Sequence, residues 1–159
     1  MMKKAWLLLG LFCLFLSGCG AKSNVITPYQ FDSDITLEFS LSKKDGIEIP
    51  DDVFETIQKQ IHEGLLAQNL LANNGNNNSH KAEILITSYR MRPDAARLLV
   101  GIMAGCDNIK SNVVVTDVKT KEKIGESEIM IEECAAWGVQ SQVIAAYSEG
   151  VVNYLAGKK

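Results

Sequence analysis

Apolar residues occupy alternate positions on both sides of a polar segment, residues 117–123, and this pattern constrains the fold more than any other feature of the sequence. A period of two residues predicts β-strands that bury one face. With a turn centred near Thr120, the two strands place Ile109 opposite Ile131 and put the odd-numbered apolar side chains on one common face. A shift of one residue would scatter that face, so we expect a β-hairpin in this register.

The N-terminus is typical of a protein exported from the bacterial cytoplasm. Two basic residues, Lys3 and Lys4, precede an apolar run over residues 5–16 and a small-residue segment that ends at Cys19. This order predicts a signal peptide over residues 1–18. The apolar run has about twelve residues, whereas a helix needs ~20 to span a bilayer, so we do not expect a transmembrane helix here.

The segment Leu16-Ser17-Gly18-Cys19 resembles the lipobox of bacterial lipoproteins, in which a peptidase cleaves before the cysteine. This resemblance implies a diacylglycerol group on the Cys19 thiol and a fatty acyl group, such as palmitate, on its new amine. Several acyl chains make membrane attachment stable, whereas a single chain anchors only marginally. Residue 20 is Gly rather than Asp, which resembles the signal for sorting to the outer membrane. We therefore expect a lipid-anchored protein of the cell outer membrane whose domain faces the periplasm.

Two cysteines, Cys106 and Cys134, remain in the mature chain beyond the lipidation site. The hairpin register that pairs Ile109 with Ile131 also places these two cysteines opposite each other. A disulfide requires Cα atoms within roughly 7 Å, a condition that directly opposed strand positions meet. Because export leads to an oxidising compartment, the sequence favours a Cys106–Cys134 disulfide over two free thiols, a redox pair or a metal site.

The mature chain has the length of a single domain. We expect residues 19–34 to form the lipidated N-terminus with a flexible tether, and residues 35–159 to form one α+β periplasmic domain. Of the 16 basic residues in the sequence, Lys3 and Lys4 leave with the signal peptide, so 14 remain against 19 acidic residues. This acidic balance argues against a nucleic-acid partner, because phosphate binding relies on clustered basic residues.

Periodicity predicts the other elements of the domain. Alternating apolar residues indicate strands over residues 35–41 and 82–91, and apolar residues about four apart indicate helices over residues 53–72 and 139–156. The apolar segment 95–105 fits either a short helix or a packed loop. Together with the hairpin, these elements predict an α+β fold with a mostly antiparallel sheet of about four strands and two long amphipathic helices packed on one face.

A resemblance to a known family rests on two segments and a closing helix. The segments are Arg97–Gly105 and Ser111-Asn112-Val113-Val114-Val115-Thr116-Asp117, the second of which precedes Thr120. They resemble the bacterial lipoprotein family known as domain of unknown function 4410, over roughly residues 35–157. The resemblance implies a lipoprotein but no activity, because that family has none established.

One local cluster of basic side chains stands out in the sequence, formed by Arg90, Arg92 and Arg97. Guanidinium groups bind carboxylates and phosphates well, so the cluster is a candidate site for a small anionic ligand or a glycan. The alternative is ordinary solvated surface, which is the more common state of such clusters.

Patterns for catalysis or metal binding are missing from the sequence. We expect His62 on the polar flank of the first helix and His80 in the Asn-rich loop that follows it, which would keep the two histidines apart. The sequence has no glycine-rich phosphate loop, and both mature-domain cysteines are assigned to a disulfide. We therefore expect no cofactor, no metal and no enzymatic activity.

The function that fits these features is that of an accessory module. We expect a membrane-anchored envelope lipoprotein that binds another envelope protein, with the arginine cluster as the basis of the alternative function. An exposed apolar patch or a bare sheet edge would favour the protein partner, and a pocket lined by the arginines would favour the ligand. The sequence leaves the oligomeric state open.

Overall fold

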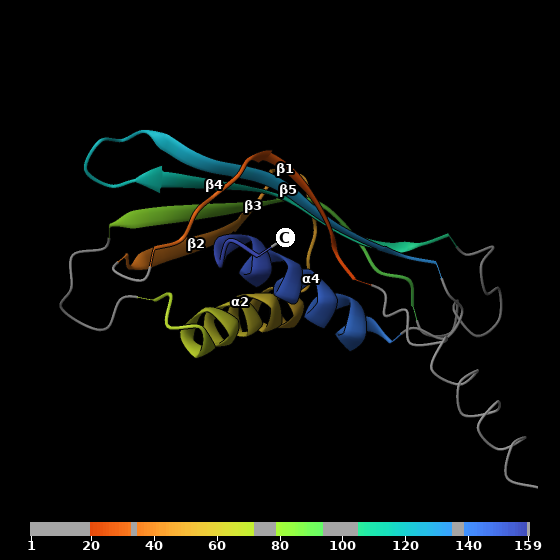
Figure 1. Cartoon of the computed structure of the whole chain (residues 1–159). Helices are drawn as coiled ribbons and strands as arrows, with labels where there is room; N and C mark the ends of the chain where they lie inside the picture. Colours follow the sequence, from red (N-terminus) through yellow and green to blue (C-terminus); the bar gives the residue numbers. More distant parts are fainter. Residues whose placement is uncertain (1–19, 33–34, 72–78, 94–104, 135–138, 159) are drawn as a thin grey trace, which may run out of the picture.

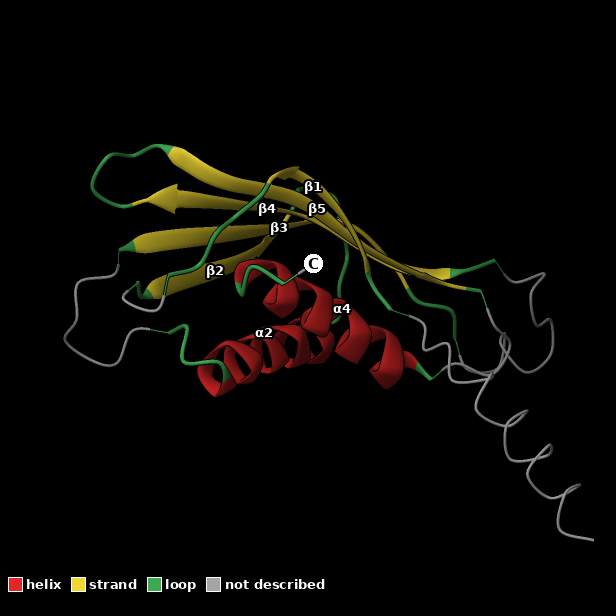
Figure 2. Ribbon diagram, viewed as in Figure 1, coloured by secondary structure: helices red, strands yellow, loops and turns green. Residues whose placement is uncertain are grey.

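A computed structural model describes residues 20–32, 35–71, 79–93, 105–134 and 139–158. The elements in these residues are, in chain order, β1 (Lys22–Thr27), β2 (Leu37–Lys43), α2 (Asp51–Ala67), β3 (His80–Arg90), β4 (Asp107–Asp117), β5 (Lys123–Glu133) and α4 (Gln140–Leu155). The strands form one sheet in the order β1-β5-β4-β3-β2 (Figure 1). Both helices lie against the same face of that sheet (Figure 2).

The predicted hairpin register is confirmed. Strands β4 and β5 pair in antiparallel orientation, with Ile109 opposite Ile131 and Ser111 opposite Ile129. The carboxylate of Asp117 holds the turn between them, because it accepts hydrogen bonds from the backbone N–H groups of Lys119 and Thr120, each at 2.8 Å. The odd-numbered side chains of both strands point to the helices and are mostly buried.

Each helix buries an apolar stripe against the sheet. The stripe of α2 has the four-residue spacing that the sequence predicted and consists of Val53, Ile57, Ile61 and Leu65. The stripe of α4 is wider, and its largest fully buried side chain is Tyr147. The two helices approach closely at Gly64, where an added Cβ would lie only 2.7 Å from Cγ2 of Val152. A glycine here lets the helices meet without displacing the neighbouring side chain.

The predicted fold class is wrong in its description of the sheet and the helices. The sheet has five strands rather than four, and it is mixed because β2 and β3 run parallel. The parallel pair arises because α2 connects β2 to β3 and returns the chain to the starting end of the sheet. Helix α2 ends at Ala67, before the predicted residue 72, and the chain turns into a short bridge between Leu71 and Leu37.

The structure places a strand within residues 19–34, which the sequence predicted as a lipidated N-terminus with a flexible tether. Residues Lys22–Thr27 form β1, which pairs with β5, and Tyr29 is 4% exposed in the core. Sequence periodicity could not reveal β1, because five of its six residues are exposed and no apolar alternation marks the strand. The predicted signal peptide and Cys19 lie outside the described residues.

The face of the sheet opposite the helices is polar. Lys110 and Glu128 form an ion pair at 2.7 Å on that face, and Lys123 pairs with Glu126. Such pairs between exposed side chains keep a sheet face soluble and contribute little to the free energy of folding. Among the described residues, neither helix combines the length and apolar character that a membrane-spanning helix needs.

Candidate functional site

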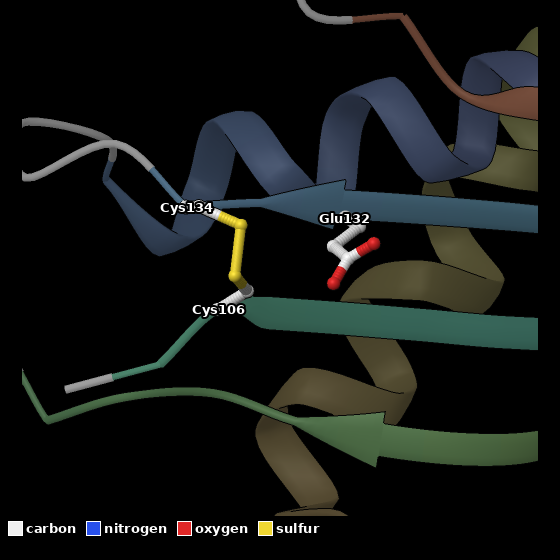
Figure 3. A group of neighbouring side chains, drawn as sticks. All are labelled: Cys106, Glu132 and Cys134. Atoms are coloured by element: carbon white, nitrogen blue, oxygen red, sulfur yellow. A yellow bond between two sulfur atoms is a disulfide. The ribbon is translucent and has the colours of Figure 1, made fainter. Parts of the chain in front are cut away.

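Four residues singled out from the sequence gather at the end of the sheet where β3 and β5 end and β4 begins, namely Arg90, Arg92, Cys106 and Cys134. We call this region the disulfide end. Cys106 and Cys134 are joined by a disulfide here, with their Cα atoms 4.2 Å apart (Figure 3). The bridge continues the β4–β5 register by one residue beyond the pair Asp107 and Glu133. The predicted disulfide is confirmed.

The carboxylate of Glu132 lies beside this disulfide on β5 (Figure 3). One donor atom from each of the three residues falls within 4.8 Å of the others, which is a spacing that metal ligands can have. Cysteine binds metals as a thiolate, however, and both sulfur atoms are already bonded to each other. In this oxidised state the group is a structural bridge with an exposed acidic neighbour.

A buried ion pair ties β3 to the same end of the sheet. Arg92 is 4% exposed and Asp107 is 0% exposed, and Nη2 of the arginine donates to Oδ2 of the aspartate at 3.0 Å. The backbone N–H of Arg92 donates to Oδ1 of the same carboxylate at 2.6 Å. The guanidinium also donates to the carbonyl oxygen of Glu133 at 3.2 Å. Arg92 therefore connects the segment after β3 to both β4 and β5.

The predicted arginine cluster does not form a ligand site around Arg92, because that guanidinium is buried and engaged inside the domain. Arg90 is exposed, and its guanidinium lies over Gly105, where an added Cβ would come within 2.7 Å of Nη2. Gly105 has a φ of +86°, so this position favours glycine on both steric and backbone grounds. Arg97 lies outside the described residues.

A second polar cluster, which the sequence did not predict, lies at the opposite end of the sheet. The hydroxyl of Tyr29 and Nδ1 of His80 are 2.9 Å apart, and Nε2 of that histidine is 3.7 Å from Oδ2 of Asp117. His80 is the first residue of β3 and pairs with Asp117 of β4, so its predicted position in a loop is wrong. The β3–β4 register could have revealed that pair, but Tyr29 was assigned to the tether.

Burial and hydrogen bonding shift the pKa values of the three residues in the second cluster. Burial raises the pKa of Tyr29 to about 12, so the hydroxyl that is hydrogen-bonded to His80 keeps its proton at neutral pH. Burial also lowers the pKa of His80, against the opposing effect of the Asp117 carboxylate. The backbone N–H of Thr120 is the main cause that lowers the pKa of Asp117. The hydrogen bond between Tyr29 and His80 joins the chain after β1 to the beginning of β3, where His80 pairs with Asp117 of β4.

The edge strand β1 presents an apolar surface near that cluster. The side chains of Val25 and Ile26 are 47% and 59% exposed. Beside them lies a groove of about 490 Å³ that includes Pro28, Tyr29 and Tyr154 in its lining. The hydroxyl of Tyr154 donates to the carbonyl oxygen of Thr27 at 3.1 Å, which holds β1 against α4. The backbone groups of an edge strand can pair with a partner strand, and exposed apolar side chains on that strand can add contact area.

Two solved structures of a PelC dodecamer share this fold. PelC from Paraburkholderia phytofirmans, a dodecamer, matches with a TM-score of 0.58 and 10% sequence identity, over 87% of this chain and 99% of that chain. A single-residue variant of the same dodecamer gives a TM-score of 0.56 and 10% identity, over 87% of this chain and 98% of that chain. Protein XCC0632 from Xanthomonas campestris gives a TM-score of 0.49 and 9% identity, over 77% and 80% of the two chains. At such low identity the likeness concerns the fold alone.

Sequence comparisons identify the family. No curated protein matches the sequence. The model of the family named domain of unknown function (DUF4410) matches residues 26–136, which is more than half of the chain. The match confirms the resemblance predicted from the sequence and begins earlier, within β1. The chain belongs to the DUF4410 family.

Proposed function

We propose that this protein is a lipid-anchored accessory module of the bacterial envelope that binds another envelope protein through the exposed edge of β1. The observation that carries the proposal is the exposure of Val25 and Ile26, at 47% and 59%, on a strand whose outer side has no neighbouring strand among the described residues. The role is one of binding rather than catalysis. An extended segment of the partner would add to the sheet beside β1.

The lipid anchor rests on the N-terminal sequence. Lys3 and Lys4, the short apolar run and the lipobox that ends at Cys19 support export, cleavage and lipidation. The residue after the lipidated cysteine is Gly20 rather than Asp, which supports sorting to the outer membrane with the domain in the periplasm. The Cys106–Cys134 disulfide agrees with an oxidising compartment.

The two edges of the sheet differ in how open they are. At the β2 edge, the backbone N–H of Leu37 donates to the carbonyl oxygen of Leu70 at 2.9 Å, so the beginning of that strand is covered. β2 also carries charged Glu38 and Lys43, which are typical of strands protected against pairing. β1 has only Lys22 as a charged residue. A protein partner therefore has better access to β1.

The groove beside β1 adds a second element of recognition. Its lining is mainly apolar, and its volume of about 490 Å³ is enough for one or two apolar side chains of the partner. Strand addition supplies backbone hydrogen bonds, and a side-chain pocket supplies specificity. The anionic-ligand alternative is less well supported, because Arg92 is held by Asp107.

The test uses an Ile26→Lys variant, which places a charge on the binding edge without touching the core. Its matched control is Leu66→Lys on α2, where the leucine is 51% exposed but lies away from β1. Both proteins are crosslinked in intact cells and purified, and the attached proteins are identified by mass spectrometry. A Cys19→Ser form provides the unanchored control.

We expect the parent protein and Leu66→Lys to recover the same envelope protein, and Ile26→Lys to lose most of it. Equal recovery by the two lysine variants would rule out the β1 edge as the binding surface. If only this chain is recovered, crosslinked to itself, the partner is a second copy of the chain and not another envelope protein. PelC, which shares the fold, is a dodecamer, so the mass of the crosslinked species must be measured.

A further inference from the structure

From the structure we infer that the disulfide end of the domain rests on the lipid bilayer and that the β4–β5 turn points away from it. This inference rests on the proposed lipidation of Cys19. The inference adds to the proposed function a surface that contacts the membrane and an orientation of the domain. The presence of an anchor alone implies neither. A domain on a long flexible tether would have no fixed orientation.

The first step is the shortness of the linker. The described chain is already a strand at Lys22, so only Gly20 and Ala21 separate β1 from Cys19. Three extended residues span at most about 10 Å. The tether predicted from the sequence would have allowed ~50 Å over fifteen residues. The shorter linker keeps the beginning of β1 next to the lipid headgroups.

The second step is that the chain is fixed from Ala21 onward. An added Cβ on Gly150 of α4 would lie only 2.5 Å from Cβ of Ala21, so the two residues are in close contact. Ser23 Oγ lies 2.9 Å from Ser127 Oγ, which joins β1 to β5. In contrast, nothing lies within 4 Å of a Cβ placed on Gly20. Gly20 is thus the only described linker residue without packing.

The third step is the direction of β1. Lys22 pairs with Met130 and Thr27 pairs with Glu126, so β1 begins beside the end of β5 that leads to Cys134. Helix α4 begins at this same end of the sheet, as Figure 1 shows. Its N-cap residue, Val139, is 50% exposed, so an apolar side chain faces outward there. The anchor, the disulfide and this side chain therefore share one end of the molecule.

The length of the sheet separates the two ends. Strand β4 has 11 residues, which at ~3.3 Å each span roughly 35 Å. The linker is about a third of that length, so the domain cannot stand upright on its β4–β5 turn without pulling β1 from the sheet. The ion pair of Arg92 with Asp107 and the disulfide hold the strands together at the membrane-facing end. Covalent geometry thus excludes the inverted orientation, and the exposed apolar side chain of Val139 favours contact between the disulfide end and lipid.

The test measures how close each end lies to lipid. The full-length lipidated protein is placed in neutral phosphatidylcholine vesicles, with its one mature tryptophan removed by Trp137→Phe. A tryptophan is then introduced by Val139→Trp at the disulfide end or by Thr120→Trp at the turn. Lipids brominated near the headgroup quench nearby tryptophan fluorescence. We expect several-fold stronger quenching for Val139→Trp than for Thr120→Trp.

A matched control lengthens the linker. A flexible Gly-Ser segment of ~12 residues, inserted between Gly20 and Ala21, raises the maximum reach of the linker to ~50 Å, more than the length of β4, and should abolish most of the difference between the two positions. Equal quenching in the unmodified linker, or stronger quenching for Thr120→Trp, would overturn the orientation. The intact mass of the purified protein distinguishes failure of the orientation from failure of the proposed lipid anchor. A mass without acyl groups on Cys19 would overturn the proposed anchor, and the orientation with it.

Discussion

At the scale of single residues, the ion pair of Arg92 and Asp107 is a buried polar interaction that joins the segment after β3 to β4. Replacing the carboxylate by Asp107→Asn removes the charge that pairs with the Arg92 guanidinium at a site where both side chains are at most 4% exposed. Loss of one partner of a buried pair costs about 3–5 kcal/mol. We expect a decrease of this size in the free energy of unfolding, measured by urea denaturation.

The control for that change is the exposed ion pair of Lys81 and Glu83, in which Nζ of the lysine lies 2.9 Å from Oε1 of the glutamate. Glu83→Gln should change the free energy of unfolding much less than Asp107→Asn does, because water screens the exposed pair. Similar losses in the two variants would mean that burial of the Arg92 pair does not govern its energy.

His80 predicts a pH dependence of stability. Burial lowers the pKa of its imidazole in the folded protein, whereas the unfolded chain has the ordinary value of 6.5. Below pH 6.5 the unfolded state therefore takes up a proton that the folded state resists, so stability falls as the pH falls. Urea denaturation between about pH 7 and pH 5 should show this loss. In His80→Gln the amide can still form a hydrogen bond with Tyr29, but the free energy of unfolding should no longer fall between these pH values through this residue. An unchanged pH dependence would show that another group causes it.

At the scale of elements, the hairpin of β4 and β5 is joined at its open end by Cys106 and Cys134, which are 28 residues apart in sequence. A loop of this size implies a stabilisation of about 3–4 kcal/mol through restriction of the unfolded chain. The double replacement Cys106→Ser with Cys134→Ser should lower the free energy of unfolding by this amount and keep the fold, because the strand register does not depend on the bridge. Reductant should affect only the parent protein, and an effect of reductant on the double variant would contradict this explanation.

Sequence patterns predicted the elements that alternate between buried and exposed residues. Ile109 and Ile131 revealed the register of the hairpin, and that register led directly to the disulfide. β1 was missed because Lys22–Thr27 is exposed on both faces and carries no such alternation. The pairing of Arg92 with Asp107 was missed for a different reason, since a contact between strands depends on how β3 lies beside β4. Local periodicity does not contain that information.

At the scale of the whole molecule, the position of β1 changes where the domain begins. The sequence placed the boundary at residue 35, whereas the sheet already includes Lys22 and the core includes Tyr29. The N-terminal segment therefore has three roles that a tether would not have. It completes the sheet, it is hydrogen-bonded to His80 at the beginning of β3, and it sets a short distance between the domain and the proposed anchor.

A truncation tests this boundary. A protein that begins at residue 35 lacks β1 and Tyr29, so it exposes the edge of β5 and opens the core beside Tyr154 and Gly125, both of which lie close to Tyr29. Loss of a large buried aromatic side chain alone costs about 3–5 kcal/mol. We expect the truncated protein to unfold at much lower urea concentration than one that begins at residue 20, or to aggregate through the exposed strand. Ile26→Lys, which alters only an exposed position of β1, should stay within about 0.5 kcal/mol of the parent. A truncated protein as stable as the longer one would show that residues 20–34 are dispensable for folding, and would return them to the role of a tether.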